Sequence, residues 1–380
     1  MAFESILSTK INDLSIAIDL LRYLAAMAVC VGHSISFFGV ADAFRAPHMP
    51  YMQNIGVMVF FVLSGFLIAH VLASGASRED YSLWAFIADR IARIYSAFLP
   101  ALVLIALIDG VLIYLNSFRF ESYTGAKIFF LNLSMFQNYP GYFKNALAVP
   151  SYGAAGHLWT LAIEFHIYLF VGAAFFFFRV KNIIPAAILA GLTVCVPIAN
   201  FSADKHGLPG AGLSILWLLG FASYYAVKMG IGRNTPMPAL AAGLCLAVWM
   251  WLSNTKPGSE FSLECYATLS ASFLLLIIIT GKIRVLSKSH NFVVAVRFCA
   301  NYSYSLYLVH YTLLFALKTF WSGNPEMGAV TGIFLSNIVA IPFAMATEFK
   351  HKKLAALLKK IPLSIASLIP KEKSPLKPLG

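Results

Sequence analysis

The chain has 380 residues, of which 59% are hydrophobic and only 12% are charged. This composition excludes a soluble fold of one or two domains and predicts a protein that crosses a membrane several times. The net charge of +12 is compatible with nucleic-acid binding, but Lys and Arg gather in the segments expected on one side of a membrane. The charge is therefore interpreted as a determinant of topology, and no nucleic-acid partner is expected.

Ten apolar segments are about long enough to cross a bilayer, which needs about 20 residues of helix. We predict an all-α, polytopic membrane helix bundle of about ten transmembrane helices, with both termini cytoplasmic because the basic residues lie on that side. Residues 1–348 form the predicted membrane domain, and residues 349–380 form a basic cytoplasmic tail. The predicted spans are 14–37, 55–73, 96–115, 156–178, 183–200, 211–228, 237–253, 262–281, 299–321 and 328–347.

The first span carries Arg22 and His33, with Asp19 near its start. Ionisable groups are costly to hold inside a membrane and usually have a function there. Arg22 and His33 are eleven positions apart, which corresponds to roughly three helical turns, or about 16 Å, so both side chains lie on about the same face. A positive charge and a proton-accepting ring are therefore predicted to line one groove at two depths.

The second and third spans contribute a hydroxyl and two further cations. Ser64 precedes Gly65, a small pair whose more favoured role is close helix packing. Arg90 and Arg93 lie three residues apart at the predicted start of the third span, so they share a helical face. Two guanidinium groups there could clamp a phosphorylated ligand, although basic residues at a helix end are also ordinary topology determinants.

The loop of residues 116–155 is polar and is predicted to lie outside, where it could cover an external site. The fourth span follows, with Trp159 as an interfacial anchor and His157 interpreted as a solvated loop residue. Glu164 and Tyr168 lie four residues apart and are predicted to face the same way.

His33 and Glu164 are predicted to share a depth in the outer half of the bundle. A carboxylate beside an imidazole fixes its tautomer and stabilises its protonated form, which suits general-base catalysis on a hydroxyl. The alternative is a buried pair that only ties two helices together.

In the ninth predicted span, Tyr307 and His310 are either interhelical contacts or further site residues. Five cysteines lack Cys-x-x-Cys spacing, and the common zinc-protease, nucleotide-binding and serine-hydrolase motifs are not found. No metal site is predicted.

Five motifs follow one another along the chain. They are Arg22-x10-His33, Phe60-Phe61-x-Leu63-Ser64-Gly65-Phe66, Arg90-x-x-Arg93, His157-x-Trp159-x-Leu161-x-x-Glu164 with Tyr168, and Ser303-Tyr304-x-x-Tyr307-Leu308-x-His310. In this order they resemble the integral membrane acyltransferase-3 family over roughly residues 15 to 347. The resemblance implies acyl transfer, mostly of acetyl, from acyl-CoA to sugar hydroxyls of surface or secreted glycans.

The resemblance also implies roles for these residues. His33, with Glu164, is expected to be catalytic, and Arg22, Arg90 and Arg93 are expected to hold acetyl-CoA or another acyl-CoA, which is a donor substrate and not a permanently bound cofactor. The expected acceptor is a carbohydrate or lipid-linked glycan. The residues expected to contact substrate are Ser64, Trp159, Tyr168, Tyr307 and His310.

The sequence therefore predicts a multi-pass O-acetyltransferase of a bacterial cytoplasmic (inner) membrane. The alternative is a secondary transporter or flippase for an anionic glycolipid, with the same Arg and His side chains lining a pathway. Paired inverted repeats with broken helices would favour that alternative, and no convincing pair is found. Direct transfer and an acyl-histidine intermediate both stay open, as does a homo-oligomer.

Overall fold

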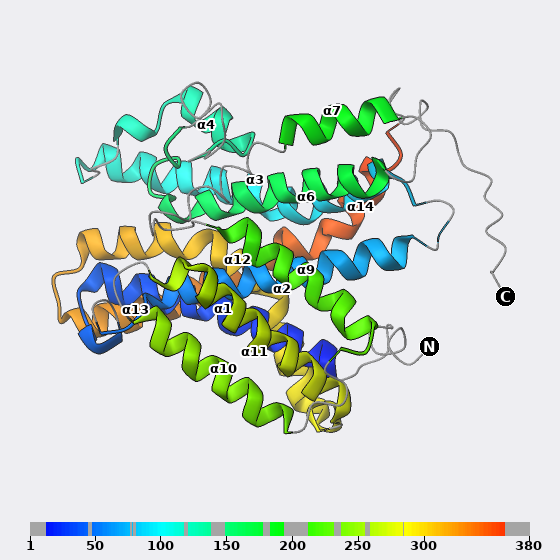
Figure 1. Ribbon diagram of the computed structural model, residues 1–380. Coiled ribbons are helices and arrows are strands. Elements are labelled where there is room, and N and C mark those ends of the chain that lie inside the picture. The colour runs from blue at the N-terminus through cyan, green and yellow to red at the C-terminus, as the bar shows by residue number, and fades with distance from the viewer. Residues whose placement is uncertain are drawn as a thin grey trace, which may run out of the picture.

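The computed structural model describes residues 13–44, 48–76, 78, 81–117, 121–137, 149–177, 183–193, 212–231, 237–254, 259–283 and 285–361. Within these ranges the regular structure is helical, apart from an isolated β-bridge between Gln137 and Val149, so the predicted all-α class is confirmed (Figure 1). The helices are α1 (Asp13–Phe38), α2 (Met52–Gly75), α3 (Leu83–Tyr114), α4 (Ala126–Leu133), α6 (Trp159–Phe177), α7 (Ile183–Thr193), α9 (Leu213–Lys228), α10 (Pro238–Ser253), α11 (Leu263–Lys282), α12 (His290–Phe320), α13 (Pro325–Ala346) and α14 (His351–Leu358).

Short 3-10 turns precede or connect several of these helices. Two of them matter for the site, because η3 leads directly into α6 and η7 joins α13 to α14. The turns are η1 (Asp42–Phe44), η2 (Glu121–Tyr123), η3 (Gly156–Leu158), η5 (Ser259–Phe261), η6 (Leu286–Lys288) and η7 (Glu348–Lys350).

Seven helical segments in the described residues are long and apolar enough to cross a membrane. They coincide with seven of the ten predicted spans, so a multi-pass membrane protein is confirmed. The other three predicted spans coincide with shorter helices. α9 and α10 have 16 residues each, and α7 has 11 and ends at Thr193, beyond which residues 194–211 lie outside the described ranges.

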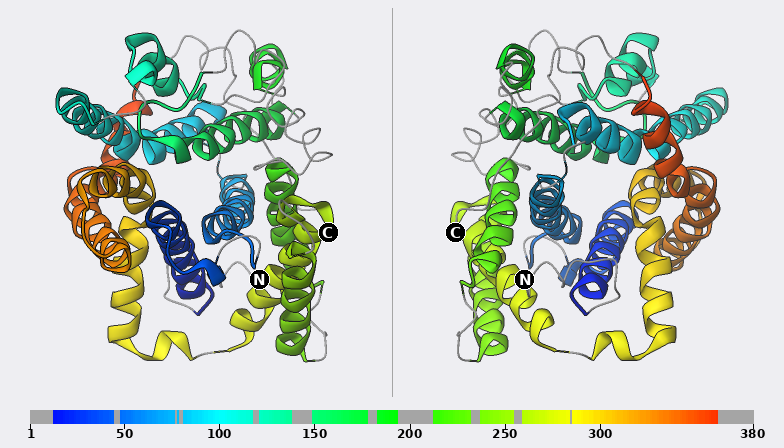
Figure 2. Two further views of the ribbon diagram at one scale, coloured as in Figure 1. Left: turned by 90° about the vertical axis from the view of Figure 1, so that its left-hand side faces the viewer. Right: turned by 90° about the vertical axis from the view of Figure 1, so that its right-hand side faces the viewer.

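The helices surround α1 and α2, which lie side by side in the middle of the bundle (Figure 2). α12 and α13 pack together on one side, and α9 packs against α2 on the other, with α10 and α11 beyond it. α3 and α6 cross the remaining side. This arrangement encloses the face of α1 that carries Arg22 and His33.

The third span begins earlier than predicted. α3 starts at Leu83, where the Ser82 hydroxyl accepts a hydrogen bond from the backbone N–H of Ala85 and caps the helix. Arg90 and Arg93 therefore lie two to three turns inside α3 and do not precede it. Their charges lower the local hydropathy, which is why an apolar window misses these turns.

α2 and α9 approach each other through glycines, as the Ser64-Gly65 pair predicts. A Cβ atom on Gly65 would lie 2.0 Å from the carbonyl oxygen of Trp217, and one on Gly220 would lie 2.2 Å from that of Val62. Both contacts are backbone contacts that no side chain can relieve. The two helices are therefore interlocked at the depth of Ser64.

Candidate active site

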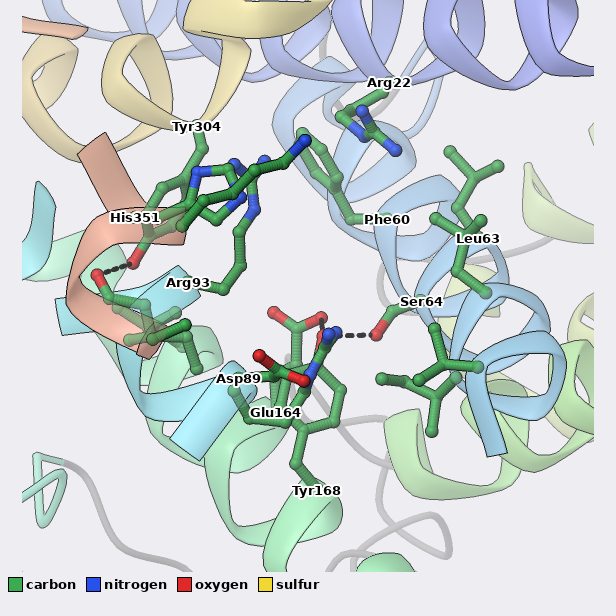
Figure 3. Close-up of a pocket in the computed structure, with 18 of the residues that line it drawn as sticks. Arg22, Phe60, Leu63, Ser64, Asp89, Arg93, Glu164, Tyr168, Tyr304 and His351 are labelled. Carbon is green, nitrogen blue, oxygen red and sulfur yellow. Dashed lines mark hydrogen bonds between the residues drawn. The ribbon is translucent and has the colours of Figure 1, made fainter. Parts of the chain in front are cut away.

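A chamber of ≈ 730 Å³ lies between α1, α2, α3, α6, α12 and α14 (Figure 3). We call it the arginine chamber, because three helical arginines reach it from two sides. Its volume falls within the range of pockets that hold a cofactor-sized ligand, about 300–1,000 Å³. Its polar lining includes Arg22, Ser64, Asp89, Arg90, Arg93, Glu164 and Tyr168.

The three arginines differ in how they are neutralised. Arg22 pairs with Asp19 on the same helix at 3.1 Å, and Arg93 pairs with the buried Glu348 at 3.0 Å. Arg90 has no ion-pair partner among the described residues, and its buried Nε atom has no hydrogen-bond partner there. Arg90 shares the chamber with Glu164 but forms no ion pair with a described residue, so its guanidinium can receive an anionic ligand.

A chain of hydrogen bonds fixes the polar groups opposite the arginines. The Trp217 indole donates to the Ser64 hydroxyl at 3.0 Å, and the Ser64 and Tyr168 hydroxyls lie 2.7 Å apart. The Tyr168 hydroxyl donates a hydrogen bond to Glu164, so the Ser64 hydroxyl is the donor to Tyr168. Every donor in this chain points toward the carboxylate, which is held beside the cations.

Apolar side chains of α2 form another part of the chamber wall, with Leu63, Leu67, Ile68 and Val71 all lining it. The chamber therefore combines a basic region with an apolar strip along one helix. That combination fits a ligand with an anionic head and a long, weakly polar arm.

A second, smaller space of ≈ 130 Å³ lies beyond the arginine chamber, and we call it the histidine chamber. His33 from α1 and His157 from η3 line it, together with Gln53 and Asn54 from α2. The Gln53 Oε1 atom is buried without a hydrogen-bond partner in the described part of the chain. Buried polar atoms without partners are unusual and indicate a place for a polar ligand or water.

Three imidazole rings meet at the histidine chamber. The His310 ring centroid lies 5.4 Å from that of His33 and 4.8 Å from that of His157. His310 Nδ1 lies 3.1 and 2.8 Å from the carbonyl oxygens of Leu306 and Tyr307, so Nδ1 carries the proton. In the neutral ring Nε2 then has a free lone pair, and no described residue donates a hydrogen bond to it.

Phe60 and Tyr307 stand between the two chambers. Phe60 lines the arginine chamber, Tyr307 lines the histidine chamber, and their ring centroids are 6.0 Å apart, edge to face. The Tyr307 hydroxyl donates to the His157 carbonyl oxygen at 2.8 Å and accepts a hydrogen bond from Thr160. These bonds hold the Tyr307 ring in place, and its contact with Phe60 joins the walls of the two chambers.

The acyltransferase-3 family model, described as an acyltransferase domain, matches residues 15–348. The match covers the helices that form both chambers, except α14. The chain belongs to the acyltransferase-3 family. It is a membrane acyltransferase, and membership of this family implies an acyl donor and an acceptor.

Two curated relatives align with most of this acyltransferase. An O-acetyl transferase of Shigella phage Sf6 is 25% identical over 330 residues, which is 84% of this chain and 92% of the relative. The acyltransferase MdmB of Streptomyces mycarofaciens is 25% identical over 327 residues, 77% of each chain. An uncharacterised protein of Haemophilus influenzae is 31% identical over 112 residues, 29% of this chain and 44% of that protein. No solved structure matches significantly.

The structure brings together most of the residues predicted for the acyltransferase site. Arg22, Arg90 and Arg93 share one chamber, and Glu164 and Tyr168 face the same way as predicted and are joined by a hydrogen bond. The remaining predicted residues divide between the chambers: Ser64 lies in the arginine chamber, Trp159 and Tyr307 line the histidine chamber, and His310 packs against His33.

The predicted pairing of Glu164 with His33 is wrong in this structure, because the two side chains line different chambers. Glu164 follows His157 by seven residues, so it lies about 10 Å further along the helical segment. That distance carries the carboxylate past Tyr307 to the arginines. The imidazoles near His33 are those of His310 and His157.

His157 is the site residue that sequence reasoning missed. It was interpreted as solvated, but it is 5% exposed and stacks on Tyr311 with ring centroids 5.2 Å apart. Its place at the outer end of the predicted fourth span gives no signal of burial. No group of three or more His, Cys, Asp or Glu side chains within the described ranges is arranged to hold a metal ion, the three histidines included.

Proposed function

We propose that this acyltransferase moves an acetyl or other short acyl group from acyl-CoA to a sugar hydroxyl of a surface or secreted glycan or glycolipid. The proposed location is a bacterial inner membrane. The carrying observation is the pair of chambers, one basic and one lined by histidines, with Phe60 of the first in edge-to-face contact with Tyr307 of the second. The Sf6 relative, named as an O-acetyl transferase, supports the acetyl group and the oxygen acceptor.

The donor is proposed to enter the arginine chamber. Guanidinium groups bind phosphate oxygens through paired, charge-assisted hydrogen bonds, and the buried Arg90 Nε has no hydrogen-bond partner among the described residues. The pantetheine arm then follows the apolar strip of Leu63 and Leu67. Its thioester reaches the Phe60–Tyr307 pair, the point nearest to the second chamber.

His33 is proposed as the general base for the acceptor. Its ring lies in the histidine chamber without a protein hydrogen-bond partner in the described residues, so a hydroxyl can take that place. The acceptor oxygen attacks the thioester carbonyl carbon while its proton passes to His33. The carbon–sulfur bond then breaks, and the leaving thiolate takes the proton from the imidazolium to give free CoA and the ester.

Transfer of labelled acetyl from acetyl-CoA into glycan tests this proposal, in inverted membrane vesicles that contain the acceptor. His33→Ala is expected to abolish incorporation, and His290→Ala, at an exposed histidine that begins α12, is expected to keep it. Full incorporation by a normally inserted His33→Ala variant would refute the role of His33.

Wild-type vesicles that incorporate no label, with acceptor present and longer acyl donors also tried, would overturn the acyl transfer itself. The transporter interpretation would then replace it, with Arg22 and His33 lining a pathway for an anionic glycolipid.

A further inference from the structure

α14 forms one wall of the arginine chamber, although it lies beyond the residues matched by the family. The side chains of α14 and its last turn that line the chamber follow one another at steps of one or three positions, so they form a single helical face. The basic residues Lys353 and Lys360 are absent from this lining. The lining residues are His351, Lys352, Ala355, Ala356 and Lys359.

Two contacts hold α14 and its last turn against α3. The Trp84 indole donates to the Leu358 carbonyl oxygen at 3.2 Å, and the Lys359 ammonium lies 2.7 and 2.9 Å from the two carboxylate oxygens of Asp89. The Lys359 side chain is 39% exposed and that of Asp89 is 29% exposed. The lysine is therefore positioned at the open edge of the chamber.

Both lysines on this face can bind a further anion. Lys352 is exposed and has no ion-pair partner among the described residues, and an ammonium group has three donors, so Lys359 retains bonding capacity beside Asp89. Arg22 and Arg93, which are 25% and 32% exposed, already have carboxylate partners. Among the basic residues of the chamber, Arg90 and Lys352 thus form no ion pair with a described residue, and Lys359 adds donors beside its partner Asp89.

The covalent order of acyl-CoA matches this distribution. The molecule runs from the acyl group through pantetheine to the diphosphate and then to the ribose, which carries a 3′-phosphate. With the acyl group at the Phe60–Tyr307 pair, the diphosphate comes to the helical arginines, and the ribose and its adenine lie further out. The α14 wall carries exposed lysines, Lys352 and Lys359, so it is a solvent-facing part of the chamber lining.

We propose that Lys352 and Lys359 bind the ribose 3′-phosphate of the acyl-CoA donor and make the enzyme selective for it. This inference rests on the proposed function. It assigns a binding role to a helix outside the matched domain and names the phosphate group that the helix recognises.

The test compares acetyl-CoA with acetyl-3′-dephospho-CoA as donors in the labelled-transfer assay. Wild type, the double variant Lys352→Ala/Lys359→Ala and the matched control Lys353→Ala/Lys360→Ala are measured with both donors. The control removes the same number of charges from the same short segment, but from positions that do not line the chamber. A Lys352→Arg/Lys359→Arg variant, which keeps the charges, accompanies them.

The double alanine variant is expected to raise the KM for acetyl-CoA by about tenfold and to leave kcat unchanged, because partly exposed charge pairs contribute modestly. Its KM for the dephospho donor should stay within about twofold of wild type. The control variant should behave as wild type with both donors, and the arginine variant should recover most of the affinity.

Two results would overturn the inference while leaving the proposed function intact. One is an unchanged KM for acetyl-CoA in the double alanine variant. The other is an equal rise of KM for both donors, which would mean that the lysines bind a lipid headgroup or support the fold. A wild-type enzyme that transfers acetyl from neither donor would overturn the proposed function as well.

Discussion

Glu348 is the residue whose replacement should most directly test how the arginine chamber is held together. Its side chain is 1% exposed, and Oε2 accepts hydrogen bonds from the backbone N–H and the hydroxyl of Ser305, at 3.1 and 2.9 Å. Oε1 lies 3.0 Å from Arg93. We expect Glu348→Gln to destabilise the fold and to release Arg93 from its position in the chamber.

The magnitude follows from the exposure of the two partners. Gln keeps an amide oxygen that can still accept from Ser305, so the main loss is the ion pair. Exposed ion pairs contribute about 0.2–1 kcal/mol, and breaking a buried pair costs about 3–5 kcal/mol. Because Glu348 is buried and Arg93 is 32% exposed, we expect about 1.5–2.5 kcal/mol of lost unfolding free energy.

A double-mutant cycle isolates this pair. Unfolding free energies of wild type, Glu348→Gln, Arg93→Gln and the double variant are measured by denaturant titration in mixed micelles. A coupling energy of at least about 1 kcal/mol is expected, since contacting charged residues are not additive. Glu348→Gln should also raise the donor KM, because Arg93 is no longer positioned.

A coupling energy below about 0.3 kcal/mol would refute an energetic role for the Glu348–Arg93 pair, since mutations at distant, independent sites already deviate from additivity by about that much. Glu348 would then act only through Ser305. Arg93 would need another explanation for its place in the chamber.

Gly65→Ala should separate α2 from α9, because its Cβ would lie 2.0 Å from the Trp217 carbonyl oxygen. Its melting temperature in detergent is expected to lie well below that of the control Gly110→Ala, where a Cβ meets no atom within 4 Å. Equal melting temperatures would contradict the interlocked packing. Tyr307→Phe keeps the ring that contacts Phe60 but removes the hydrogen bond to the His157 carbonyl. Its kcat for acetyl transfer should fall about tenfold, which corresponds to about 1.4 kcal/mol, with the donor KM unchanged. A kcat equal to that of wild type would show that this bond has no part in positioning His157.

The sequence predicted the parts of the fold that depend on local composition. Seven spans are predicted correctly, because segment length and hydropathy can be read from consecutive residues alone. The first turns of α3 were missed because Asp89, Arg90 and Arg93 make that stretch too polar for an apolar window. These turns are helical because Ser82 caps them, and their charged side chains line a chamber inside the protein.

The candidate site was predictable where the residues share a helix. The contact of Tyr168 with Glu164 follows from their spacing of four residues. The meeting of His33 with His310 depends on how α1 and α12 are rotated and staggered against each other, which no local pattern specifies. The rotation and stagger of α1 against α6 are likewise not specified locally. For this reason the sequence places Glu164 beside His33, whereas His157 lies near His33 and Glu164 lies about two turns beyond His157.

The adjacent residues Ser64 and Gly65 set a limit on how this enzyme can be redesigned. Ser64 belongs to the hydrogen-bonded chain that reaches Glu164, and Gly65 touches the backbone of α9. A substitution that alters the Gly65 contact with α9 therefore also displaces Ser64 from its hydrogen bonds. Few substitutions on the α2 wall of the chamber can change donor binding without this effect. Variation can accumulate on the opposite wall, where the exposed side chains of Lys352 and Ala356 face the chamber. Libraries intended to alter donor choice should therefore begin at α14.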